Sequence, residues 1–231
     1  MFGRIFLTAL AAGLLSGIFI WGAHSIKTTP LILAAEVYED AGPGAGSHHE
    51  QPQKEPAAPT ENEWASGDRF ERGVYTLLTD VLTSIGFAFL LVGAITLSGR
   101  SIDWRRGVLW GAAGFAAFYV SPSLGLAPEL PGMQAADLSA RQAWWLGTAA
   151  ATAAGLALVA LQSRTWLRGL GVGLIVLPHV IGAPAHEITA AGDVPAELAS
   201  EFAIATLVVT GLFWMVLGGL SGYFYNRFER P

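Results

Sequence analysis

Six long apolar runs, nearly free of charged side chains, restrict this chain more than any other feature of its sequence. They cover residues 4–23, 74–97, 107–121, 144–161, 169–183 and 201–224. Four of them approach or exceed the roughly 20 residues that a helix needs to cross about 30 Å of hydrocarbon. A backbone in lipid must satisfy its own hydrogen bonds, and a helix does so within one segment. We therefore expect an all-α integral membrane protein whose 231 residues form a single transmembrane domain, a bundle of about six helices.

The third and fifth runs are short, and each is interrupted by a proline, Pro122 or Pro178. The stretches SPSLGLAPELPGM and LPHVIGAPAHE share a proline, four residues and then Ala-Pro. A diverged duplication of a two-helix unit and a chance similarity both explain this repeated pattern. We expect the helix to kink or unwind at Pro178, because proline has no amide hydrogen and its ring crowds the carbonyl of Leu174. Paired broken helices are typical of binding sites in transporters, where they expose backbone carbonyls to an ion.

Glycines at a spacing of four residues predict close helix packing in lipid. The pairs are Gly13 with Gly17, Gly107 with Gly111, Gly169 with Gly173, and Gly218 with Gly222. Because the chain is rich in small residues, the spacing does not say which helices meet.

Positive charges sort to one side of the apolar runs. If the amino terminus is cytoplasmic, the inner segments hold eight of the thirteen Lys and Arg residues, a bias that orients membrane chains. These eight are Arg4, Arg100, Arg105, Arg106, Arg164, Arg168, Arg227 and Arg230. Most carboxylates lie on the outer side, where they either attract cations to an entrance or only keep the loops soluble. We predict a multi-pass membrane protein with both termini in the cytoplasm.

Residues 36–70, between the first two runs, are acidic and rich in Pro, Gly and Ala. Such a composition buries too little apolar surface to order itself, so we expect a flexible outer loop. His48 and His49 lie within it. Adjacent histidines on a mobile segment are candidates for weak metal capture, although two ligands do not make a structural site. A role in metal capture and no role at all are equally compatible with this pattern.

Asp80 lies well inside the second run, with Thr76, Thr83 and Ser84 at helical spacings that place them on its side. An ionisable group at that depth is costly unless it faces the bundle interior or water, which makes Asp80 a candidate for metal contact or proton movement. Local hydrogen bonding to the hydroxyls is the structural alternative. His24, at the outer end of the first run, is a further candidate for metal capture or an ordinary interfacial residue.

His179, His186 and Glu187 surround the prolines of the fifth run, and Glu129 follows the equivalent Ala-Pro after the third. Imidazole nitrogen with carboxylate oxygen suits borderline divalent metals such as cobalt, nickel or zinc. We hypothesise that these four residues face one another across an outer polar vestibule. The plain alternative is that His179 reaches the membrane interface and that His186 and Glu187 begin a loop.

The chain lacks the sequence motifs of several enzyme classes. The chain has no cysteine, no phosphate-binding loop that ends in Lys and Ser or Thr, and no Gly-x-Ser-x-Gly turn. His186-Glu187 begins a zinc-protease pattern, but Ala190 stands where its second histidine is needed. The net charge of −5 and the absence of a basic patch give no support for nucleic-acid binding. We expect a protein that is not an enzyme and has no permanently bound cofactor.

The order of several stretches resembles that of the CbtA family, the integral-membrane subunit of a probable cobalt transporter. The stretches are MFGRIFLTALAAGLLSG, PLILAAEVYE, SPSLGLAPELPGM, RQAWWLGT, LPHVIGAP and FWMVLGGLSGYFYNRF. The resemblance implies uptake of cobalt or another divalent cation as substrate, linked to cobalamin synthesis. It also implies a location in the bacterial cytoplasmic (inner) membrane and a small single-span, histidine-bearing partner similar to CbtB. The alternative is a membrane protein that does not transport, but binds metal at the outer face and passes it to a partner.

Overall fold

The computed structural model describes residues 2–40, 61–185 and 194–229, and these residues form helices without any strand. The elements are α1 (Phe2–Ala23), π-helix η1 (His24–Thr28), α2 (Thr29–Asp40), α3 (Glu61–Ser98), α4 (Trp104–Phe115), π-helix η2 (Ala116–Val120), α5 (Ser121–Ser123), α6 (Leu138–Leu161), α7 (Thr165–Ile181) and α8 (Ala196–Arg227). The predicted all-α membrane fold is confirmed. Four helical stretches are long and apolar enough to cross a membrane: Phe2–Tyr38, Phe70–Ser98, Leu138–Leu161 and Ala196–Arg227.

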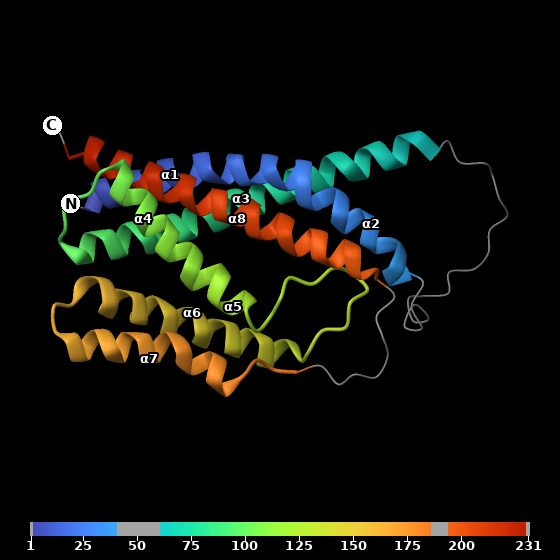
Figure 1. The fold of residues 1–231 in the computed structure, drawn as a ribbon. Coiled ribbons are helices and arrows are strands. Elements are labelled where there is room, and N and C mark those ends of the chain that lie inside the picture. The colour runs from blue at the N-terminus through green and yellow to red at the C-terminus, as the bar shows by residue number, and fades with distance from the viewer. Residues whose placement is uncertain (1, 41–60, 186–193, 230–231) are drawn as a thin grey trace.

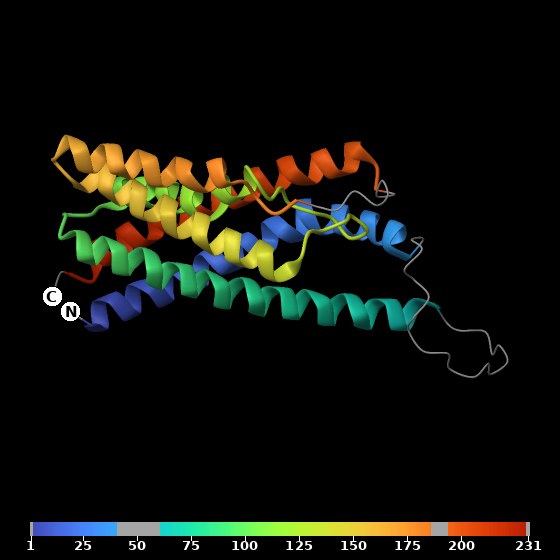
Figure 2. The same ribbon diagram turned by 90° about the horizontal axis from the view of Figure 1, so that it is seen from below.

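The helices run roughly side by side, and α1, α3, α4 and α8 form the main bundle (Figure 1). The hairpin of α6 and α7 lies along one flank, and α6 joins it to the bundle through η2 and α5. Figure 2 shows the two termini at the same end of the bundle. Arg4 ties these ends together, since its Nε donates to the carbonyl of Tyr225 at 2.7 Å and its Nη2 lies 3.0 Å from a carboxylate oxygen of Glu229.

Glycines bring α4 and α8 into backbone contact. A Cβ added at Gly218 would lie 2.3 Å from the carbonyl oxygen of Gly107, and one at Gly111 would lie 2.1 Å from that of Trp214. Gly13 and Gly17 meet α3 in the same way, each at 2.5 Å from a Cα atom. Close backbone approach of this kind replaces the hydrophobic driving force that lipid removes.

The predicted glycine contact on α7 is wrong. Gly169 and Gly173 face open space, and it is Gly171 that packs against Gly155 of α6. Both faces of α7 carry glycine, so the spacing alone did not select the face that meets a neighbour.

Two prolines each follow a π-helical turn. η1 is followed by Thr29 and Pro30, and η2 is followed by Ser121 and Pro122. A proline ring displaces the carbonyl four residues earlier, and the wider turn makes room: the amide of Thr29 donates to His24, and that of Ser121 donates to Ala116, both five residues back. π turns inside helices occur frequently at functional sites.

Pro178 behaves differently from Pro122. It lies inside α7, which continues to Ile181 and ends at Gly182 with φ 89°. Of the two expected outcomes, a kink or unwinding, the helix is therefore not unwound at Pro178. The structural counterpart of Pro122 is Pro30, a residue outside the repeated stretch.

Residues 36–40 and 61–70 are helical, where the sequence predicted a flexible loop. α2 continues to Asp40 and α3 begins at Glu61, so both ends of the expected loop are helix. Packing accounts for the end in α2, because Ala35 is fully buried against Leu130 and Phe202 and holds α2 to the bundle. His48 and His49 lie outside the described residues.

Candidate functional site

A cavity of about 210 Å³ lies where both π-helices face α3 and α8. Its polar lining consists of His24, Asp80, Thr83, Ser84, Tyr119 and Thr210. Its apolar lining consists of Ile20, Phe87, Phe118, Phe213 and Trp214. The cavity therefore combines a small set of polar groups with aromatic walls, which is the usual composition of a small-ligand site.

His24 and Asp80 form the centre of this lining. The Nδ1 atom of His24 lies 3.1 Å from Oδ2 of Asp80, and the aspartate side chain is 15% exposed. An ionisable group inside a membrane helix requires a partner or a water-filled space, and Asp80 has His24 as its partner and borders the cavity. The two residues are 56 positions apart in the chain, so no local sequence pattern links them. Pro30 was the sequence signal that could have pointed to this site, because a proline predicts a disturbed helix near His24.

Hydroxyl groups extend the site beyond this pair. Thr83 and Ser84 of α3 line the cavity as their spacing from Asp80 predicted, and Ser84 is 1% exposed. Thr76 does not line it, and its hydroxyl donates to the carbonyl of Arg72 on the same helix. Tyr119 of η2 donates to Oγ1 of Thr206 at 2.8 Å, which fixes η2 against α8.

This arrangement offers one imidazole, one carboxylate and several hydroxyls to a cation. Nitrogen and oxygen ligands together suit borderline divalent metals. Among the described residues, no three His, Asp or Glu side chains gather closely enough to hold a metal. A metal at His24 and Asp80 would therefore keep water or hydroxyl oxygens in its remaining coordination positions. A structural metal site, in contrast, fills all its coordination positions with protein ligands.

His179 lies on the other side of the α4–η2–α5 helix. Its Nε2 is 3.1 Å from Oγ of Ser121, which in turn lies 2.8 Å from Oγ1 of Thr152. The indole ring of Trp144 meets the imidazole edge-on at 6.1 Å between centroids. The same short stretch thus presents Tyr119 to the cavity and Ser121 to His179.

Glu129 lies in the connection between α5 and α6, where its Oε2 is 2.6 Å from Nη2 of Arg141. The neighbouring residue Leu130 is buried against Ala35 and Phe202, which anchors this connection to α2 and α8. His186 and Glu187 lie outside the described residues. The hypothesis of a four-residue vestibule therefore stays a prediction, with His179 and Glu129 each placed beside a partner of its own.

The sequence model of one family, described as "Probable cobalt transporter subunit (CbtA)", matches residues 2–226. No curated protein and no solved structure matches the chain. The family match covers every described helix except the last residue of α8, Arg227, and includes both π-helices and all the residues that line the cavity. The chain therefore belongs to the CbtA family of probable cobalt transporter subunits.

Proposed function

We propose that this chain forms the route by which a divalent metal ion, with cobalt as the preferred substrate, enters the cell through the cytoplasmic membrane. The observation that carries the proposal is the His24–Asp80 pair inside the bundle, at a cavity bordered by two π-helices. The family description supports cobalt as the metal. The uptake route is proposed to serve cobalamin synthesis and to work with a small single-span, histidine-bearing subunit similar to CbtB.

The ligand set fits transport better than storage. A transported ion must be bound well enough to leave water and weakly enough to leave the protein. One carboxylate and one imidazole, supplemented by the hydroxyls of Thr83, Ser84 and Thr210, meet both conditions. Each π-helix also precedes a proline that donates no backbone hydrogen bond, which frees carbonyl oxygen for an ion or water and gives the helix a point of bending.

Uptake of radioactive cobalt tests the proposal directly. Cells that express the chain together with its small partner are expected to accumulate cobalt severalfold above cells that carry an empty vector, and cells with the partner alone are not. Cobalamin production under cobalt limitation should rise in parallel. If the purified chain binds cobalt but cells accumulate none above the vector control, the protein only binds metal and passes it on.

The same assay tests the outer vestibule. The double variant His179→Ala with His186→Ala should lower uptake at limiting cobalt if these imidazoles collect the ion at the entrance. Because His179 also contacts Ser121, the amount of folded protein must be measured beside the transport. Normal uptake per folded molecule would remove both histidines from the pathway.

The orientation of the chain is tested separately. The structure places both termini at one end of the bundle (Figure 1), and the Arg bias predicts that this end is cytoplasmic. A reporter that is active only outside the cytoplasm, fused after Arg230, is expected to give no signal. The same reporter inserted within residues 41–60 should be active, and the reverse pattern would invert the proposed direction of entry.

A further inference from the structure

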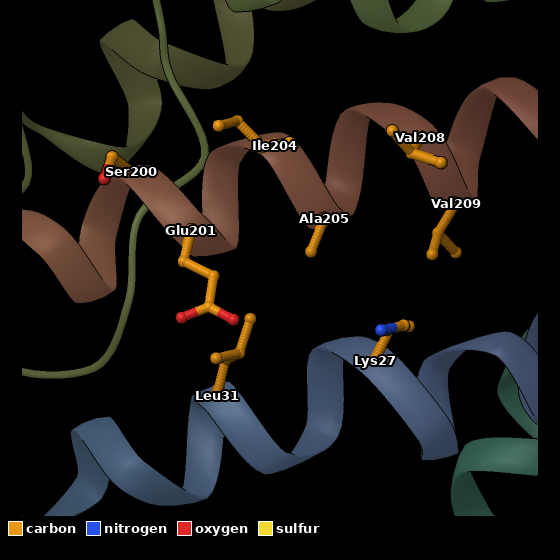
Figure 3. A pocket seen from close by; sticks show the side chains of 8 residues that line it. All are labelled: Lys27, Leu31, Ser200, Glu201, Ile204, Ala205, Val208 and Val209. Atoms are coloured by element: carbon orange, nitrogen blue, oxygen red, sulfur yellow. The ribbon is translucent and has the colours of Figure 1, made fainter.

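A second, larger hollow lies on the side of the bundle, between the η1–α2 stretch and the first half of α8. Its volume is about 450 Å³, within the range of small-molecule sites in proteins. Figure 3 shows the residues that line it: Lys27, Leu31, Ser200, Glu201, Ile204, Ala205, Val208 and Val209. We call this hollow the Lys27 groove. It is distinct from the cavity at His24 and Asp80, with which it shares no lining residue.

The groove carries one positive side chain, one negative side chain and the hydroxyl of Ser200 on an otherwise apolar surface. In Figure 3, Glu201 points from α8 toward Leu31, whereas Lys27 lies about one turn further along, facing Ala205 and Val209. Within the described parts of the chain, neither Lys27 nor Glu201 takes part in an ion pair. The two opposite charges are therefore held apart along one groove, without neutralising each other.

Helix geometry places these charges near a membrane surface. Arg4 marks the opposite surface through its contacts with Tyr225 and Glu229. Lys27 lies 23 residues (27 − 4) further along a continuous helical stretch, which corresponds to roughly 34 Å at 1.5 Å per residue. Glu201 lies 26 residues (227 − 201) before Arg227, or roughly 39 Å. The hydrocarbon is about 30 Å thick, and the bilayer with its headgroups measures about 40–45 Å. Lys27 thus lies at the hydrocarbon boundary and Glu201 further out among the headgroups.

We propose that the Lys27 groove binds a zwitterionic phospholipid with a primary amine, such as phosphatidylethanolamine. In this lipid the phosphate lies deeper than the ammonium group, which matches the order of Lys27 and Glu201 along the groove. The ammonium of Lys27 pairs with the phosphate, and the carboxylate of Glu201 with the hydroxyl of Ser200 accepts hydrogen bonds from the lipid amine. An acyl chain then lies deeper than Lys27, along Val208, which is 53% exposed. An anionic lipid without an amine would be repelled by Glu201.

Native mass spectrometry of the purified full chain in detergent tests this proposal. The probes are phosphatidylethanolamine, phosphatidylcholine and phosphatidylglycerol with identical acyl chains. The chain is expected to retain phosphatidylethanolamine best and phosphatidylglycerol least. Lys27→Ala should weaken phosphatidylethanolamine binding about fivefold, the usual worth of one lysine near a lipid phosphate. Glu197→Gln, one turn from Glu201 and outside the groove lining, is the matched control and should leave lipid binding unchanged.

A charge swap separates lipid binding from simple attraction between the two side chains. The variant Lys27→Glu with Glu201→Lys keeps the net charge but reverses the order of charges along the groove, so the preference for phosphatidylethanolamine should disappear. Ala205→Trp fills the floor of the groove and should reduce binding of all three lipids, while the elution profile on size exclusion stays that of the parent protein. Equal retention of all three lipids by the parent chain, or a swapped variant that keeps the parent preference, overturns the proposal. A dimer that is lost in Ala205→Trp would assign the groove to a second copy of the chain instead.

Discussion

Replacing Asp80 by asparagine is expected to abolish cobalt uptake at limiting metal while the amount of protein in the membrane stays the same. Asparagine has the same size, and its side-chain oxygen can still accept a hydrogen bond from Nδ1 of His24 when that nitrogen carries a proton. The substitution removes the negative charge of the cavity. Loss of a residue that merely orients a metal ligand costs about 10–100-fold in affinity, so loss of the ligand itself should lower uptake at least about tenfold. Radioactive cobalt uptake, normalised to folded protein, measures the effect.

Two further variants show whether His24 and Asp80 act as one site. His24→Gln should lower uptake as well, and the double variant should be little worse than Asp80→Asn alone, because residues in direct contact do not act additively. Thr76→Val is the matched control, since Thr76 lies one turn from Asp80 and outside the cavity lining. If Asp80→Asn reduces expression but each remaining molecule transports normally, Asp80 is a structural residue and the proposed metal path is wrong.

A single methyl group at Gly218 is expected to disrupt the bundle. The Cβ of Gly218→Ala would lie 2.3 Å from the carbonyl oxygen of Gly107 and 2.7 Å from backbone atoms of Gly111. Because these are backbone atoms, no side-chain rotation relieves the contact, and α4 and α8 must separate. Inserting one carbon into a well-packed interior costs about 1–3 kcal/mol, and we expect the upper end of that range or more. A lower thermal midpoint in detergent and a loss of the monodisperse elution peak would report the effect.

Neighbouring glycines provide controls for this prediction. A Cβ at Gly219 would lie 3.4 Å from a methyl group of Val108, and a Cβ at Gly173 would meet nothing within 4 Å. Gly219→Ala and Gly173→Ala should be neutral or slightly stabilising, since alanine favours a helix by about 1 kcal/mol over glycine. Equal stability of Gly218→Ala and Gly219→Ala would show that α4 and α8 are further apart than described here.

The sequence predicted the class of fold because that class depends on local properties. Apolar runs of membrane length must be helical in lipid, whatever their neighbours are. The glycine pairs of α1, α4 and α8 were also found correctly, since small residues are needed wherever two backbones meet. α7 shows the limit of that rule, because Gly171 packs on Gly155 while Gly169 and Gly173 do not pack. Which face of a helix is buried depends on the helix beside it.

The pairing of His24 with Asp80 was decided only by the tertiary structure. Nothing local links residues 56 positions apart, and they meet because Gly13 and Gly17 let α1 lie directly against Ile85 and Val81 of α3. The turn of η1 before Pro30 then sets the direction of His24. In the same way, Ser121 of α5 and His179 of α7 lie 3.1 Å apart, a contact between residues far apart in the chain that the sequence did not predict. The sequence by itself determined that the apolar runs form helices of a membrane protein, because a backbone in lipid must satisfy its own hydrogen bonds within each segment. Helix crossing and backbone register, which depend on contacts between distant segments, decided which polar groups face one another.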